Sequence, residues 1–215
     1  MKQVFLFVIL FVSVTSYSQN SKTLIYNENS IIAVTNNVES FDNLSRADIT
    51  PYTLKHTESV TQYGLTYTVN VLRYKGWEDE TGDYNVIDIS SGSYKSQFTY
   101  DEGWDYFYCE NEAVNTPNKS FYAVNLSSSC MALVFVGVSI ASQPPFITVI
   151  VLRDRKAEIV YNKPAFMKDI QTAGKETRFI LRLNTIEYDE NNKPYEKEDL
   201  ATLSFGDGKI YYMKN

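Results

Sequence analysis

The chain has 215 residues, which is enough for one globular domain or at most two small ones. It carries 26 acidic and 20 basic residues, for a net charge of −6. This charge, without a basic cluster, repels phosphate backbones and anionic lipid head groups, so it argues against a nucleic-acid-binding protein. Tyrosine and phenylalanine are abundant while glycine and proline are sparse, which favours pleated sheets over disorder.

The first eighteen residues predict an export signal. Lys2 precedes an apolar run from Val4 to Val14, and the small residues Ser16 and Ser18 follow it. This is the pattern of a secretory signal peptide, cleaved here before Gln19. The run is too short for a membrane-spanning helix, which needs about 20 apolar residues. The ending Ser-Tyr-Ser-Gln resembles signal peptides of Gram-negative bacteria, and there is no cysteine near the cut to carry a lipid anchor.

Cleavage defines the expected mature protein. Residues 1–18 would be removed, and residues 19–215 would form a single β-rich globular domain. We expect that domain to be exported, either periplasmic or secreted, with no integral membrane segment left after cleavage.

Periodicity in the first half of the chain predicts strands. Leu65–Val71 alternates between apolar and polar residues, as a half-buried strand does. The segment 38–61 is polar and weakly patterned, which indicates a long loop with a short helix. Short strands are expected at 23–26, 30–35, 84–89 and 97–100, the last of them before a turn at 101–103.

The middle of the chain is its most apolar part. The runs Leu133–Val136 and Ile147–Leu152 are apolar at nearly every position, which is typical of strands covered on both faces. We therefore expect the core sheet here. Its four predicted strands cover residues 120–126, 131–138, 146–152 and 157–161.

A helix is predicted near 164–173. Asn162 or Lys163 would cap it, Pro164 fits its first turn, and Gly174 fits just past its end. Its apolar residues fall on one face at helical spacing. They are Phe166, Met167, Ile170 and Ala173.

Strands resume at 178–188, 200–205 and 209–213, separated by turn-like sequence at 189–194 and 206–208. The predicted fold is a mainly β, single antiparallel sandwich or partly closed barrel, with one short helix near 164–173.

Two cysteines, Cys109 and Cys130, are present. Export into an oxidising compartment favours a disulfide between them. The bridge would close a loop of about 20 residues, worth roughly 3 kcal/mol in the chain-entropy model. The alternative is two buried free thiols.

Common catalytic patterns are missing from the sequence. His56 is the only histidine, and no glycine elbow or metal-ligand partner lies near it, so an exposed polar residue is the simpler interpretation. A zinc site needs several histidine or cysteine ligands. No glycine-rich phosphate or dinucleotide motif occurs. The sequence therefore predicts no cofactor, no metal site and no catalytic residue.

Carboxylates are grouped in two places, at 78–83 and 101–105. A glycosidase needs two carboxylates held across a cleft, and acid-rich β proteins always offer such candidates. Asp79, Thr81 and Asp83 also have the alternate spacing of calcium ligands, although the EF-hand pattern does not match. Solvated turn residues are the simpler interpretation of both groups.

The aromatic residues give the most suggestive pattern. Trp77 and Trp104 each follow a glycine and precede acidic residues, and Asp105, Tyr106 and Tyr108 follow the second tryptophan. Exposed rings of this kind stack on sugars or form protein interfaces. We therefore select these five residues as the candidate ligand-binding set. The alternative is that the two tryptophans are core residues.

Three functions remain open. The first is an exported, non-enzymatic binding or interaction module for a glycan or a protein surface. The second is an extracellular or periplasmic hydrolase that uses paired carboxylates. The third is a lipocalin-like carrier of a small ligand.

Overall fold

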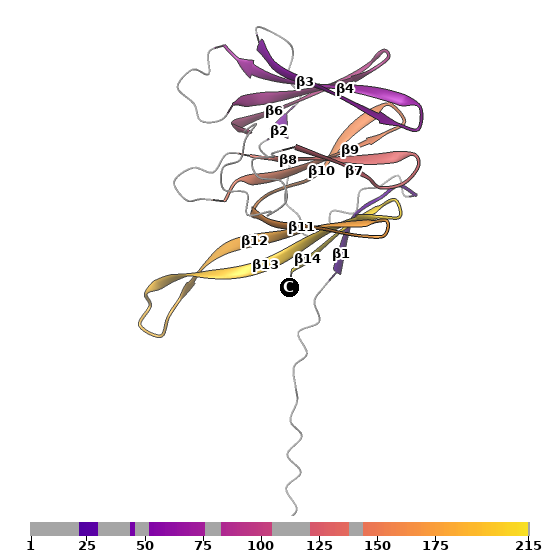
Figure 1. The fold of residues 1–215 in the computed structure, drawn as a ribbon. Helices are drawn as coiled ribbons and strands as arrows, with labels where there is room; N and C mark the ends of the chain where they lie inside the picture. Colours follow the sequence, from indigo (N-terminus) through magenta and orange to yellow (C-terminus); the bar gives the residue numbers. More distant parts are fainter. Residues whose placement is uncertain are drawn as a thin grey trace, which may run out of the picture.

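The structure, a computed structural model, describes residues 22–29, 44–45, 52–75, 83–104, 121–137 and 144–214. Within these ranges there are 14 strands and no helix. The strands form three antiparallel sheets, which are stacked as layers and are not closed into a barrel (Figure 1). The predicted antiparallel β-sandwich is confirmed, with three layers in place of two.

We name the layers by their place in Figure 1. The upper sheet has the strand order β2-β6-β5-β4-β3. Its strands are β2 (Leu44–Ser45), β3 (Tyr52–Gln62), β4 (Leu65–Tyr74), β5 (Tyr84–Ser91) and β6 (Tyr94–Trp104). The middle sheet has the order β10-β9-β8-β7. Its strands are β7 (Phe121–Asn125), β8 (Cys130–Val136), β9 (Phe146–Arg153) and β10 (Lys156–Pro164).

The lower sheet contains strands from both ends of the described chain, in the order β1-β14-β13-β12-β11. Its strands are β1 (Lys22–Asn27), β11 (Phe166–Ala173), β12 (Glu176–Tyr188), β13 (Pro194–Gly206) and β14 (Lys209–Lys214). The first strand, β1, therefore pairs with the last strand, β14.

The middle sheet is covered on both faces, as its apolar runs predict. Leu133 and Ile150 pack in a core shared with the upper sheet. Val134 and Val149, one residue away in each strand, pack in a second core shared with the lower sheet. All four side chains are fully buried. One sheet thus supplies a face to each of two hydrophobic cores.

The helix predicted near 164–173 is wrong, because this segment is strand β11, paired with β12. A bulge between Met167 and Asp169 inserts one extra residue into β11. Met167 and Ile170 are consequently three residues apart but lie opposite Leu181 and Phe179, which belong to the same core. The bulge therefore produces the apolar spacing of a helix within a strand.

Two other expectations need correction. The weakly patterned segment up to residue 61 contains β3, an edge strand that is exposed along most of its length. The turn expected at 101–103 is part of β6, which continues to Trp104. The strand predicted at 30–35 and the signal peptide at 1–18 lie outside the described residues.

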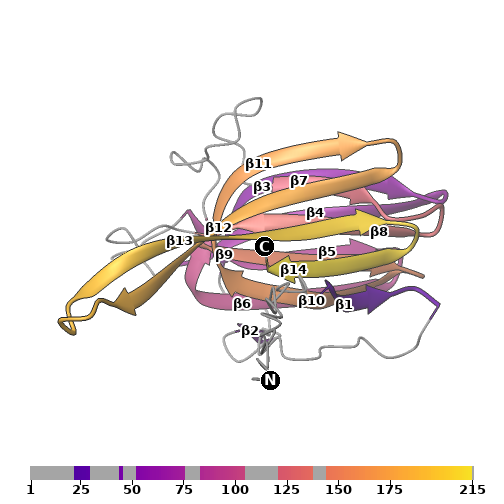
Figure 2. The same ribbon diagram turned by 90° about the horizontal axis from the view of Figure 1, so that it is seen from below.

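The outer halves of β12 and β13 form an arm that projects beyond the other strands (Figures 1 and 2). Tyr188 and Tyr195, close to its tip, are 64% and 46% exposed. The arm is the outer part of one hairpin, in which β12 and β13 pair without a shift from Thr177–Phe205 to Tyr188–Pro194.

Candidate binding groove

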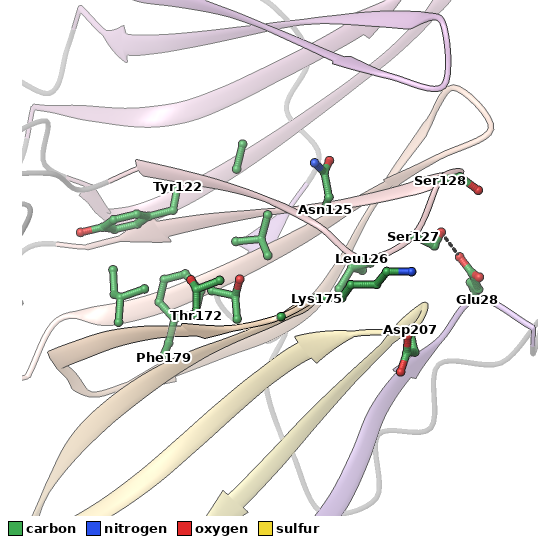
Figure 3. Close-up of a pocket in the computed structure, with 15 residues that line it drawn as sticks. Glu28, Tyr122, Asn125, Leu126, Ser127, Ser128, Thr172, Lys175, Phe179 and Asp207 are labelled. Atoms are coloured by element: carbon green, nitrogen blue, oxygen red, sulfur yellow. Dashed lines mark hydrogen bonds between the residues drawn. The ribbon is translucent and has the colours of Figure 1, made fainter.

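An open groove of about 910 Å³ lies between the middle and lower sheets, along β7 (Figure 3). It is lined by β7 and the turn that follows, by the β11–β12 hairpin, and by Glu28 and Asp207 from two neighbouring turns. β7 is the last strand of the middle sheet and β11 the last strand of the lower sheet. The groove therefore opens at the edges of two layers, and its volume is in the range of ordinary ligand sites.

The floor of the groove is apolar. Phe179 of β12 is buried, and its ring centroid lies 5.5 Å from that of Tyr122 in β7. Val124 and Ile170 line the same space. Since β7 packs over β12, the next strand outward, β11, extends past the edge of the middle sheet. The last three residues of β11 are exposed accordingly.

The rim at the turn end of the groove is charged. Glu28, Lys175 and Asp207 line it there (Figure 3). Ser127 Oγ donates a hydrogen bond of 2.5 Å to Glu28 Oε2. Gly208 has a φ of +70°, and a Cβ atom at this position would overlap the Glu28 carboxyl group. A glycine is needed at this position for two reasons: the turn requires a positive φ, and the Glu28 side chain occupies the space of a Cβ atom.

Hydrogen bonds join all three layers at this end of the groove. Gln62 Nε2 of the upper sheet donates to the Ser127 carbonyl at 2.6 Å. The Glu28 N–H donates to the Gly208 carbonyl, and the Gly208 N–H donates to the Leu126 carbonyl, both at 2.9 Å. The rim is therefore held by backbone and side-chain contacts from separate sheets.

The prediction that Trp104 offers an exposed ring is wrong. Trp104 is fully buried, and its indole N–H donates to Thr148 Oγ1 at 3.1 Å. Tyr84 stacks on the ring at a centroid distance of 5.8 Å, and Tyr100 lies 5.5 Å away. Trp104 is thus a core residue between the upper and middle sheets. The other selected residues, Trp77, Asp105, Tyr106 and Tyr108, lie outside the described residues.

His56 is exposed, as predicted, but on strand β3 and not in a loop. Its Nε2 lies 2.6 Å from Glu58 Oε1, and both side chains are about half exposed. The pair does not line the groove described above.

Cys130 is buried, with its Sγ 3.4 Å from the Tyr26 hydroxyl, and it forms no disulfide with any described residue. Burial raises the pKa of the Cys130 thiol to about 11, so the reactive thiolate is disfavoured near neutrality. Cys109 lies outside the described residues, and the Cys109–Cys130 bridge stays a prediction.

The acidic groups that suggested a hydrolase or calcium site fall mostly outside the described residues. Asp83 is described, and its N–H donates to the Trp104 carbonyl at 2.9 Å. Within the described ranges, no group of three or more histidine, cysteine or carboxylate side chains is placed to hold a metal ion.

Comparisons with protein-family models, with curated proteins and with solved structures found no match to this chain. Among the residues that the structure describes, no helix has the length and apolarity needed to cross a membrane.

The groove was not predicted from the sequence. Its charged residues, Glu28, Lys175 and Asp207, come from three separate turns. No spacing in the sequence connects them, because the pairing of β1 with β14 and the stacking of the layers bring them together. Turn composition predicts where the turns are, but not which turns meet.

Proposed function

We propose that this protein is an exported, non-enzymatic binding module and that the groove along β7 is its ligand site. The observation that carries the proposal is the groove itself, with its apolar floor at Tyr122 and Phe179 and its charged rim at Glu28, Lys175 and Asp207. Polar groups make up most of the exposed lining, and the rings form a smaller apolar floor, a mixture that suits a glycan or a polypeptide. The ligand is a glycan or a segment of a protein.

Two chemical features support binding over catalysis. The only histidine lies on β3, paired with Glu58, and is not part of the groove lining. The Cys130 thiol is buried with a raised pKa, which makes it a poor nucleophile. Export rests on the N-terminal pattern, as does the bacterial source suggested by the resemblance of that signal.

The Cys109–Cys130 bridge belongs to the same proposal, because an exported chain meets an oxidising compartment. Mass measurement of the unreduced, denatured protein after alkylation tests it. Two modified thiols would rule the bridge out and leave the binding proposal unaffected.

The test of the groove is a pair of charged substitutions on one strand. Thr172 lines the groove, while its neighbour Gln171 points to the other face of β11. A glycan array and a displayed random-peptide library provide the ligand screen. Thr172→Arg should abolish binding of the selected ligand, and Gln171→Arg should not. Equal binding by both variants would place the site elsewhere and overturn the proposal.

A hydrolase is the second candidate, because two carboxylates, Glu28 and Asp207, line the same groove. A panel of fluorogenic glycosides would reveal such an activity. If turnover is found and both Glu28→Gln and Asp207→Asn abolish it, the groove is an active site and not a passive binding site.

A further inference from the structure

We propose that the groove accepts its ligand as an added β-strand: an extended polypeptide segment pairs with the free edge of β7 and lies on β11. This inference rests on the proposed function and specifies its ligand class. It commits to a polypeptide, and binding of a glycan is an outcome of the test.

Among the described strands, β7 pairs along one edge only, with β8. The Leu126 N–H donates to the Cys130 carbonyl, and the pairing of β7 with β8 continues from there without a shift. Hydrogen-bonded pairs alternate along an antiparallel ladder, so Tyr122 and Val124 point their backbone groups at β8. Ala123 and Asn125 therefore point theirs outward, and both residues are exposed.

The opposite edge strand of the middle sheet, β10, has contacts along its outer edge. At β10, the Ala157 N–H donates to the Tyr94 hydroxyl at 2.9 Å, and this hydroxyl also lies 3.4 Å from the Ala157 carbonyl. The same strand also contacts β6 of the upper sheet and β1 of the lower sheet. A covered edge is the usual protection against unwanted strand pairing. Within the part of the chain that the structure describes, no strand pairs with the outer edge of β7 and no side chain is hydrogen-bonded to it.

The groove beside β7, above β11, is where one more strand could lie. The middle sheet has four strands and the lower sheet has five. Because Tyr122 of β7 packs on Phe179 of β12, β11 extends beyond β7 as a ledge. Ile170 and Thr172 of β11 line the groove above this ledge. A strand added to β7 would place every second side chain against them.

Charge indicates which end of the groove would take a basic residue of the added segment. Glu28 and Asp207 lie at the end of the groove near the turn after β7, where Lys175 is the one cation among the lining residues that the structure describes. We take the added segment to be antiparallel to β7, as β8 is, so its amino end lies at this end of the groove. The partner we infer has alternating apolar side chains and a basic residue near its amino end.

The test uses proline on two free edges. Ala123→Pro removes an outward N–H of β7 and leaves the ladder to β8 intact, because proline is tolerated on an edge. Ser59→Pro does the same on β3, where the Gln62–Leu65 hairpin pairing puts the Ser59 N–H outward. The probe is a peptide selected against the parent protein from a displayed random library. Ala123→Pro should weaken its binding at least about tenfold, and Ser59→Pro should match the parent.

A second measurement keeps the inference testable if Ala123→Pro fails to fold. Alternate residues of the selected peptide are N-methylated and their binding to the parent protein is measured. Methylation of one alternating set should weaken binding at least about tenfold, and methylation of the other set should not. Hydrogen exchange at Ala123 and Asn125 should slow when the peptide binds.

Three results would overturn strand addition. The first is a peptide that binds Ala123→Pro, or every N-methylated form, as it binds the parent. If Thr172→Arg still abolishes its binding, the groove remains the binding site and only strand addition fails. The second is a screen in which only glycans bind. The third is binding unaffected by both Ala123→Pro and Thr172→Arg, which would overturn the proposed function as well.

Discussion

Trp104 links the two layers of the upper core. Its buried indole contacts Tyr84, Tyr100 and Phe135, and its N–H is hydrogen-bonded to Thr148 of the middle sheet. A large side chain in this position cannot be removed without leaving a cavity and an unpaired polar group.

Substitution of Trp104 by alanine should therefore destabilise the protein by about 3–5 kcal/mol. Urea unfolding followed by circular dichroism measures this change. The control is His56→Ala, an exposed position that should shift the free energy of unfolding by less than about 0.5 kcal/mol. A Trp104→Ala protein as stable as the parent would contradict the core position of this residue.

Gly208 and Gly64 form a matched pair at the residue level. Both have φ near +70°, but only Gly208 has another group, the Glu28 carboxyl, where a Cβ atom would lie. Gly64→Ala should cost about 1–2 kcal/mol for the left-handed backbone alone. Gly208→Ala should cost about 1 kcal/mol more, because Glu28 must leave Ser127. Chemical denaturation of both variants checks the difference, which should vanish in a Glu28→Ala background.

The Cys130 thiol makes stability depend on pH in the reduced protein. Burial raises its pKa to about 11, from about 8.5 for an unfolded thiol. The folded state thus favours the protonated form, and this contribution is complete below about pH 8.5 and lost as the pH rises through about 11. The free energy of unfolding should fall across that window more steeply in the parent than in Cys130→Ala. Parallel pH profiles for the two proteins would contradict this.

At the level of elements, the sequence predicts strands well where both faces of the strand are buried. The runs at 133–136 and 147–152 are apolar on both faces, and both became central strands of the doubly covered sheet. β11 was mistaken for a helix because one bulged residue changed its spacing. β3 was missed because an edge strand exposed on both faces has no apolar alternation. In both cases the strand is specified by its partner, which local sequence does not reveal.

We expect that the projecting arm of β12 and β13 can be shortened without loss of the core. Its tip from Tyr188 to Tyr195 is exposed, so replacing residues 187–195 by Asn-Gly, a two-residue hairpin turn, should change the free energy of unfolding by less than about 0.5 kcal/mol. Thermal unfolding measures this, and ligand binding to the groove should remain that of the parent. A loss of binding would show that the arm contributes to the ligand site.

For the whole molecule, the fold class followed from composition and alternation, whereas the groove did not. Its walls meet only because three sheets stack and because β1 crosses to pair with β14. Such long-range pairing depends on the complete chain and leaves no local pattern in the sequence.

The mature protein should begin at Gln19. The short apolar run and the small residues Ser16 and Ser18 motivate this position of cleavage. N-terminal sequencing of the exported fraction decides it. Recovery of intact residues 1–18 from that fraction would contradict the export signal.

The pairing of β1 with β14 makes the order of synthesis matter for folding. Of the described strands, the ribosome makes β1 first and β14 last, so the described partner of β1 is made only after all the other described strands. The strands of the upper and middle layers are made in between, so these layers can associate before β14 is available. Until β14 is made, β1 lacks the strand with which it pairs. A chain that ends before residue 209 therefore leaves β1 without this partner and exposes the edge of β13 that pairs with β14. Truncated products of this protein should therefore be the ones that aggregate.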